Sequence, residues 1–426
     1  MYPRLFIINE TFGGTRMDPV AGMEAAKYIL LSGVIIIAAG ALSIIVSQRL
    51  RVPDVPIFLI AGILLGPGVA GVLNIAAESA LNQVILIFGA CCILFDGGAS
   101  VRLKVLKDVW ISLTALATIG VLITAGIAAL AAWYWLELPP LTALLLGAVI
   151  APTDPATIIP VFRQVRIKEK VSQTLISESA FNDATGSVIM LAILSVAIGS
   201  TSFSVTAALA DLLKQSVIGI IIGFATGYLG AFLIAHEKYN FLARYAPLVT
   251  LMAVIGTYLG AEGLQASGFM AVFVFGTIIG NKRSFGFRME RHEKEKLDDF
   301  VARTAMIMRM FIFILLGSQV DFGLLSYSLP GAVFVVVIFM LAARPMTVFL
   351  CALLDRRAGW NLRELLFMSW TRETGVIPAA LAGLLLGKDI PGAQAIASVT
   401  FIAILMTILV QATTAKWTAR KLGLLE

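Results

Sequence analysis

The chain has 426 residues, of which 59% are hydrophobic and only 14% are charged. Soluble, disordered and nucleic-acid-binding proteins of this length carry far more charge, so the composition excludes these classes and indicates an integral membrane protein. The net charge of +6 fits the same class, because polytopic membrane proteins retain Lys and Arg in their cytoplasmic loops.

Blocks of about 20 apolar residues, separated by short polar breaks, predict an all-α polytopic protein. Thirteen spans are expected, at residues 25 to 48, 55 to 73, 81 to 99, 109 to 136, 140 to 162, 171 to 199, 206 to 235, 245 to 263, 266 to 280, 299 to 317, 329 to 354, 364 to 387 and 391 to 415. Residues 1 to 24 lack the pattern of a signal peptide and are interpreted as a tail. Residues 421 to 426 form a second short tail.

The distribution of basic residues sets the expected orientation. Of the 32 Lys and Arg residues, 23 fall in the loops after the odd-numbered spans and in the C-terminal tail, whereas five fall on the other side. By the positive-inside rule, the N-terminus lies outside and the C-terminus lies in the cytoplasm, which an odd number of spans requires. We therefore expect a multi-pass protein of the plasma membrane.

A weak internal repeat relates the two halves of the chain. The segment from Gly62 to Gly66 in span 2 resembles the segment from Gly276 to Gly280 in span 9, and the polar break at Thr153 in span 5 corresponds to the break at Thr374 in span 12. A separation of seven spans inverts the second copy, and inverted repeats with broken helices are typical of secondary transporters. The repeats are expected at about 25–199 and 245–415, joined by a linker helix at 206–235, within one domain of residues 25–420.

The chain offers few residues for disulfide or transition-metal chemistry. Cys91, Cys92 and Cys351 all lie in apolar runs, and His236 and His292 are the two histidines. Neither set has the spacing of a disulfide framework or a metal cluster. We expect no cofactor.

Span 5 contains a polar break near its centre, at Thr153 and Asp154. Pro152, Pro155 and Pro160 surround this break, and each proline removes one backbone donor, so the helix is expected to open there. Freed carbonyls, the Thr153 hydroxyl and the Asp154 carboxylate are hard oxygen ligands that suit an alkali cation. The alternative is a proline kink in which Asp154 caps the second half-helix of span 5.

Span 6 carries four polar residues within about one and a half helical turns. They are Glu178, Ser179, Asn182 and Asp183. Ser179 lies three positions before Asn182 and four before Asp183, so it shares a helix face with both. Ordinary interhelical hydrogen bonds would account for Ser179 and Asn182. They do not account for Asp183, because a carboxylate at mid-membrane without a basic neighbour on its own helix indicates a functional group.

Charged residues also occur in spans 3, 11 and 12. Asp96 ends span 3, Arg344 lies in span 11, and Arg372 and Glu373 precede a glycine and a proline in span 12. Because a buried charge requires an opposite charge, the two arginines are natural counter-ions for Asp154, Glu178 and Asp96. Whether the arginines only hold the carboxylates in place or take part in transport stays open, and so does the choice of pairs.

Several motifs together resemble the NhaP-type branch of the monovalent cation:proton antiporters, relatives of the animal sodium/proton exchangers. The resemblance covers most of residues 25 to 420. It is carried by Arg51-Val-Pro53, Gly66-Pro67, Phe95-Asp96-Gly97-Gly98, Thr153-Asp154-Pro155, Glu178-Ser179 with Asn182-Asp183, Ser267-Gly268-Phe269-Met270-Ala271 and Ala343-Arg344-Pro345.

This resemblance implies a fold and a set of residue roles. The fold has thirteen helices in two inverted repeats, with spans 5 and 12 crossing at unwound centres, and a dimer domain that makes a homodimer. Thr153, Ser179 and Asp183 would bind the cation, Na⁺ or K⁺, and Asp183 would also bind the proton. Asp154 and Asn182 would organise the site.

The resemblance further implies an ion pair between Glu178 and Arg372. The family commonly has an arginine directly before the glycine of span 12, whereas Glu373 and Thr374 separate Arg372 from Gly375 here. The implied activity is exchange of a monovalent cation for H⁺ by alternating access, with no enzymatic reaction. One titratable carboxylate beside the neutral Asn182 predicts an electroneutral 1:1 exchange.

Two other functions would also place polar residues inside the membrane. A cation channel or uniporter would use the same oxygen ligands along a pore, and remains the alternative. An intramembrane aspartic protease resembles paired Tyr-Asp and Gly-x-Gly-Asp motifs, and neither occurs in this chain. The sequence leaves open the choice among Na⁺, K⁺ and Li⁺, because the same oxygen atoms bind all three.

Overall fold

A computed structural model describes residues 19–50, 52–77, 79–154, 159, 162, 167–199, 205–236, 242–320, 322–386 and 390–425. These residues form helices joined by short connections, and the one β-type contact among them is an isolated bridge between Ile167 and Leu425. The expectation of an all-α fold is confirmed. Residues 1–18 of the predicted tail and most of the second half of predicted span 5 lie outside the described residues.

Each α-helix overlaps a predicted span, but some begin earlier: α1 begins at Pro19, within the predicted tail of residues 1 to 24, and α12 begins at Arg291 rather than at residue 299. In chain order they are α1 (Pro19–Leu50), α2 (Asp54–Leu65), α3 (Ala80–Ser100), α4 (Leu103–Ala117), α5 (Ile119–Trp135), α6 (Pro140–Ile150), α8 (Glu169–Ala197), α9 (Val205–Ala235), η1 (Ala243–Tyr245), α10 (Ala246–Gly263), α11 (Gly268–Gly280), η2 (Lys282–Phe285), α12 (Arg291–Ser318), α13 (Phe322–Ile338), η3 (Phe339–Ala343), α14 (Arg344–Leu353), α15 (Leu362–Trp370), α16 (Val376–Leu386), α17 (Ala393–Met406), η4 (Thr407–Ala412) and α18 (Thr413–Lys421).

The described helices have the lengths that a membrane protein needs. Nine helical segments of the described residues are long and apolar enough to cross a membrane. Four shorter apolar helices, α2, α6, α11 and α16, stand at predicted spans 2, 5, 9 and 12. Two of these, α6 and α16, are short because their spans are interrupted.

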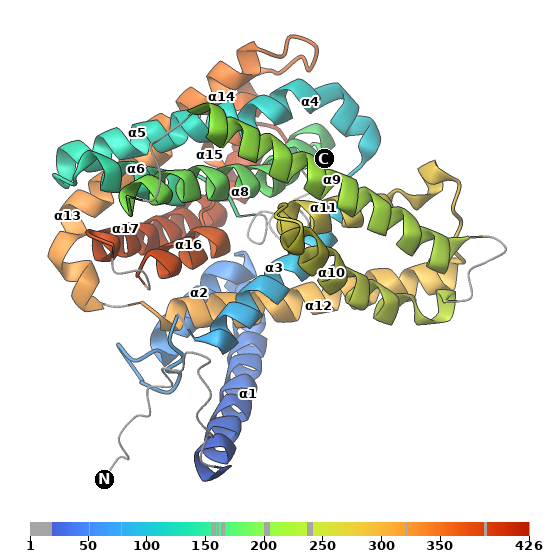
Figure 1. Cartoon of the computed structure of the whole chain (residues 1–426), viewed down its shortest axis with the longest axis horizontal. Coiled ribbons are helices and arrows are strands. Elements are labelled where there is room, and N and C mark those ends of the chain that lie inside the picture. The colour runs from blue at the N-terminus through green and yellow to red at the C-terminus, as the bar shows by residue number, and fades with distance from the viewer. Residues whose placement is uncertain are drawn as a thin grey trace.

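Glycines bring two pairs of helices into close contact. Gly62 on α2 and Gly66 at its C-cap lie against the backbone of Ile314 and Ser318 on α12. On α11, Gly276 and Gly280 lie against the backbone of α3. A methyl group at any of these glycines would overlap the neighbouring backbone, so only glycine permits this approach. The glycine pairs on which the sequence repeat rests therefore occupy equivalent close contacts. Figure 1 shows α2 and α12 side by side, with α3 next to α12 and α1 projecting away from the bundle.

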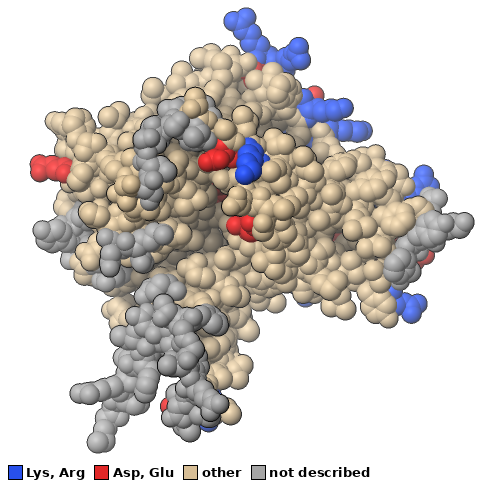
Figure 2. Space-filling view, viewed as in Figure 1, with Lys and Arg blue, Asp and Glu red and all other residues tan. Residues whose placement is uncertain are grey.

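The outer surface is apolar, as a lipid-facing surface should be. Leu30 on α1 and Met252 on α10 are 71% and 73% exposed, and many other large apolar side chains are exposed as well. In Figure 2 most of the visible face is uncharged, with Lys and Arg mainly along its upper and right-hand edges. This pattern supports a multi-pass membrane protein, whose surface is exposed to hydrocarbon rather than to water.

Candidate functional site

Two interrupted helices meet in the core of the bundle. After α6 ends at Ile150, residues 151–154 are not helical, and residues 371–375 between α15 and α16 are not helical either. The Asp154 N–H donates to the Glu373 carbonyl at 2.8 Å, and the Val376 N–H donates to Asp154 Oδ2 at 3.3 Å. Asp154 therefore caps α16, a half-helix of the other interrupted span, and joins the two non-helical stretches.

Gly375 makes this junction possible. Its Cα lies so close to the Asp154 carboxylate that a Cβ would overlap the carboxylate oxygen. The same requirement holds on the other side of residues 151–154, where a Cβ on Gly186 of α8 would overlap the Pro152 ring. Both glycines are needed for close approach rather than for an unusual φ.

Helix α8 fixes the Thr153 backbone and side chain. The Thr153 N–H donates to Asn182 Oδ1 at 3.1 Å, and Asn182 Nδ2 donates to Thr153 Oγ1 at 2.8 Å. The Thr153 hydroxyl donates to Ser179 Oγ at 2.9 Å. The structure therefore brings Thr153, Ser179 and Asn182 together, and Asn182 uses both ends of its amide to hold Thr153.

Asp183 differs from these three residues in its hydrogen bonding. It is 1% exposed, and neither carboxylate oxygen has a hydrogen-bond partner among the described residues. It follows Asn182 directly and lies one turn from Ser179, on the face that contacts Thr153. A buried carboxylate is stable only when it is neutralised or paired, so Asp183 requires a proton or a cation that no side chain in the described part of the chain supplies.

Glu178 forms a buried ion pair, and its partner is Arg344. Arg344 Nη2 lies 2.9 Å from Glu178 Oε2, Arg344 Nη1 bonds the other carboxylate oxygen, and Arg344 Nε donates to the Met368 carbonyl at 3.1 Å. The expected pair between Glu178 and Arg372 is therefore wrong. Arg344 as a counter-ion of Glu178, one of the pairs that the sequence left open, is confirmed.

Arg372 points toward α5 and α6 instead. Its guanidinium donates to the Ala151 carbonyl and, at 3.3 Å, to Thr124 Oγ1, and it lies 4.6 Å from the centre of the Phe339 ring. Ala151 follows the last residue of α6, where the chain leaves the helix, and the residue four positions later is a proline without an N–H, so the Ala151 carbonyl lacks a helical donor. This orphan acceptor explains why Arg372 turns away from Glu178.

The remaining candidates are buried near this centre. Glu373 is fully buried, and neither carboxylate oxygen has a hydrogen-bond partner among the described residues. Asp96 is buried near the end of α3, where the adjacent Gly97 packs against Ile159 and Ile176.

Sequence reasoning missed polar residues of span 13. The Thr374 N–H donates to Thr407 Oγ1 at 3.1 Å, and Gln411 is fully buried one turn further along. Both belong to η4, a π-helical turn, and η3, a second π turn, directly precedes Arg344. Such turns frequently occur at functional sites. The spacing of Thr407 and Gln411, four positions apart in an apolar span, could have indicated a shared polar face. The π turns cannot be predicted from the sequence.

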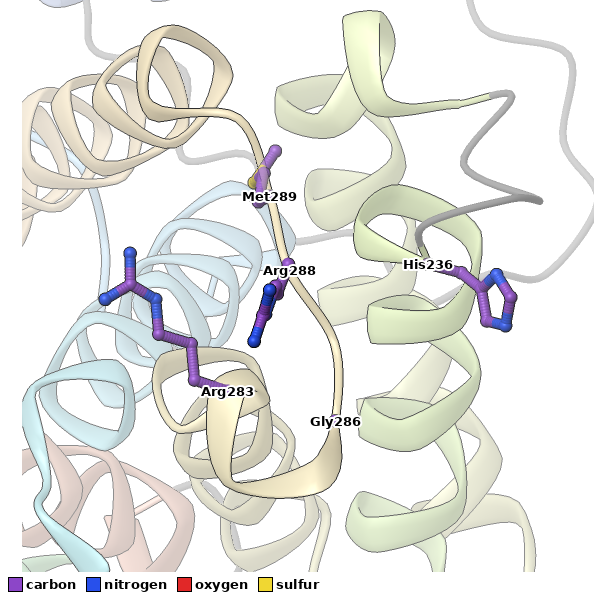
Figure 3. Close-up of a pocket in the computed structure, with 5 residues that line it drawn as sticks. All are labelled: His236, Arg283, Gly286, Arg288 and Met289. Carbon is purple, nitrogen blue, oxygen red and sulfur yellow. The ribbon is translucent and has the colours of Figure 1, made fainter.

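A surface hollow of about 710 Å³ lies apart from this centre. It is lined by His236, Arg283, Gly286, Arg288 and Met289, at the end of α9 and between α11 and α12. In Figure 3 the two arginine side chains extend to the same side of the connecting segment, and His236 points away from them. The hollow belongs to the basic loop after predicted span 9 and not to the carboxylate site.

Buried carboxylates at two interrupted helices, inside a bundle of apolar helices, define an ion-translocating membrane protein. The family profile described as "Sodium/hydrogen exchanger, transmembrane" matches residues 34–421. The chain belongs to this sodium/hydrogen exchanger family, which consists of secondary transporters.

Relatives and a solved structure agree with this assignment. The chain is 31% identical to Na(+)/H(+) antiporter 1 of Methanocaldococcus jannaschii over 371 residues, which cover 84% of this chain and 83% of the relative. It is 28% identical to K(+)/H(+) antiporter NhaP of Alkalimonas amylolytica over 91% of this chain and 66% of the relative. The solved structure of the sodium proton antiporter MjNhaP1 from M. jannaschii superposes with a TM-score of 0.78, at 29% identity, over 94% of this chain and 99% of that one.

Proposed function

We propose that this protein exchanges a monovalent cation, Na⁺ or K⁺, for H⁺ across the membrane as a secondary active antiporter. The observation that carries the proposal is Asp183, a fully buried carboxylate whose oxygens have no hydrogen-bond partner among the described residues. A group in this state binds either a proton or a cation. Competition between the two for one carboxylate couples their movements.

Two hydroxyl side chains would provide further oxygen ligands for the cation at Asp183. Ser179 and Thr153, already hydrogen-bonded to each other, supply hydroxyl oxygens on the same side of α8. Together with the carboxylate they are the hard ligands that an alkali cation prefers. Asn182 and Asp154 act as positioning residues, because they hold Thr153 and the start of α16 in place.

Alternating access requires that the site open to one side of the membrane at a time. The two non-helical stretches support this proposal, since they meet through the hydrogen bonds of Asp154. The inverted repeats about 25–199 and 245–415, with residues 206–235 as linker, would supply two moving halves. Glu178 and Arg344 would keep the site rigid during the movement.

We place the protein in the plasma membrane as a homodimer, with its N-terminus outside and its C-terminus in the cytoplasm. The excess of Lys and Arg in alternate loops supports the orientation. α1, α9 and α10 are the least buried of the candidate spans, so their faces contact lipid or a second copy. Chemical cross-linking in native membranes distinguishes these two surroundings.

The test is transport by purified protein in proteoliposomes. An outward or inward gradient of Na⁺, K⁺ or Li⁺ should drive a pH change of the vesicle lumen, and the cations that do so define the selectivity. Asp183→Asn should abolish the pH change, because an amide neither takes up and releases a proton in this pH range nor supplies the negative charge that neutralises the cation. Asp211→Asn, which alters an exposed carboxylate on α9, is the matched control and should transport normally.

Two results would overturn the proposal. Exchange by Asp183→Asn at the wild-type rate would remove Asp183 from its role. Cation flux that needs no opposing proton movement would identify a channel or uniporter instead of an antiporter.

A further inference from the structure

Buried polar side chains without hydrogen-bond partners concentrate in the non-helical residues 371–375 and in the neighbouring segment η4. The atoms are both carboxylate oxygens of Glu373, the hydroxyls of Thr371 and Thr374, and both ends of the Gln411 amide, and none has a hydrogen-bond partner among the described residues. All four residues are fully buried. A buried polar group without a hydrogen-bond partner is unfavourable, so this concentration indicates a bound species.

Residues 370–374 and residues 407–414 lie side by side, and the register between these two segments places Gln411 opposite Glu373. Trp370 Nε1 donates to Thr414 Oγ1 at 2.9 Å, and the Thr374 N–H donates to Thr407 Oγ1 at 3.1 Å. The two segments therefore run antiparallel, with residues 371–373 level with residues 408–413. Gln411 lies four residues after Thr407 and three before Thr414, which puts it on the face that both contacts share.

This arrangement repeats the first site in the second half of the chain. In the first half the Thr153 N–H bonds Asn182 on the following long helix, and unpartnered Asp183 is adjacent. In the second half the Thr374 N–H bonds Thr407 on the following helix, and unpartnered Gln411 lies one turn away. Each interrupted span thus presents a threonine to a polar pair on its neighbour.

The chemistry of the second cluster suits a monovalent cation. Carboxylate, amide and hydroxyl oxygens are hard ligands, and Glu373 supplies one negative charge. The two buried arginines nearby contact other groups, since Arg344 pairs with Glu178 and Arg372 bonds the Ala151 carbonyl. An oxygen cage with one negative charge, whose neighbouring arginines already bond other groups, matches a singly charged ion.

We propose that Glu373, Gln411, Thr371 and Thr374 form a second coordination site for the transported cation, next to the Asp183 site and on its α15 side. This inference rests on the proposed cation exchange. The second site holds the ion as it approaches or leaves Asp183, with Asp154 between the two. Its occupancy raises the local cation concentration at Asp183, so the site affects apparent affinity more than turnover.

The kinetic test compares two substitutions of Gln411 in proteoliposomes. Gln411→Met keeps the length of the side chain and removes the amide oxygen, and it should raise the KM for the transported cation about tenfold, or about 1.4 kcal/mol, with kcat retained. Gln411→Glu restores an oxygen ligand and should keep a KM close to that of the wild type. An unchanged KM in Gln411→Met, or an equal rise in both variants, contradicts the site.

Direct detection uses crystals soaked in Tl⁺, which substitutes for alkali cations. The wild type should give an anomalous peak between Glu373 and Gln411, and Gln411→Met should lose that peak. Absence of the peak in the wild type at a Tl⁺ concentration that fills the Asp183 site would overturn the proposal, whatever the kinetics of the variants.

The two proposals fail in different ways. Asp183→Asn should abolish exchange and keep the Tl⁺ peak at Glu373, because the second site does not contain Asp183. Wild-type vesicles without cation-driven proton movement would refute the exchange itself. Normal exchange without a Tl⁺ peak at Glu373 would refute only the second site.

Discussion

The Glu178 and Arg344 side chains have opposite charges and lie in the interior of the bundle, where water is excluded. They are 2% and 1% exposed, and the guanidinium bonds both carboxylate oxygens. Such a pair offsets its own desolvation only when both partners are present. The buried charged residues therefore differ in whether they have a partner. Glu178 and Arg344 pair with each other, whereas Asp183 lacks a hydrogen-bond partner among the described residues.

Removing one partner of this pair should destabilise the protein strongly. Arg344→Met leaves the Glu178 carboxylate buried without its counter-ion, and a single loss of this kind costs about 3–5 kcal/mol. Chemical denaturation in detergent micelles measures the free energy of unfolding. The double variant Glu178→Gln with Arg344→Met should lose less than the sum of the two single variants. Additive losses would show that the two charges do not interact.

At the scale of the elements, the junction of the interrupted helices depends on one glycine. Gly375→Ala should abolish or strongly slow exchange, because the new methyl group overlaps the Asp154 carboxylate and separates residues 151–154 from the start of α16. Gly383→Ala, on the same half-helix, is the matched control, since open space surrounds the position of its Cβ. Transport rates in proteoliposomes check both. Equal rates would mean that the junction is not needed.

A second element-scale junction joins α4 to the loop after α14. The Asp355 carboxylate accepts the Ser112 N–H at 3.0 Å, the Ser112 hydroxyl at 2.7 Å and the Ala358 N–H at 3.1 Å. Burial alone would raise the pKa of Asp355, but the hydrogen bonds from Ser112 and the backbone outweigh it and lower the pKa below the ordinary value. The folded state therefore favours the ionised carboxylate.

This lowered pKa predicts how stability changes with pH. The contribution of Asp355 is fully present above the pKa of the unfolded chain, about 4, and is lost as the pH falls through the lower pKa of the folded state. Asp355→Asn should be less stable than the wild type by about 2 kcal/mol at neutral pH. The difference should shrink in acid. Thermal unfolding of both proteins over this pH range measures it, and a constant difference would contradict the linkage.

For the whole molecule, the charge carried per cycle depends on how many carboxylates alternate between proton and cation. Asn182 is neutral and already bonds Thr153 at both ends, which leaves Asp183 as the exchanging group. One proton then replaces one monovalent cation. A membrane potential, worth about 2.3 kcal/mol per elementary charge at about 100 mV, should not drive exchange of this stoichiometry.

The measurement imposes inside-negative and then inside-positive potentials on proteoliposomes without proton or cation gradients. A lumenal pH dye should report no sustained change in either case. A change that reverses with the potential would mean that a second group, such as Glu373 or Asp154, also carries protons. Asp183→Asn vesicles give the background leak.

The sequence by itself determined the class and the fold, and it singled out most residues of the candidate site. Hydropathy locates the spans because every backbone group in lipid must bond within its own helix, and Thr153, Ser179, Asn182 and Asp183 stood out because polar groups are costly there. Only the tertiary structure decided which buried charged side chains pair with each other. Arg344 rather than Arg372 reaches Glu178, because the proline-freed Ala151 carbonyl takes Arg372. Local spacing does not encode such a choice, since it depends on which distant helix comes within reach.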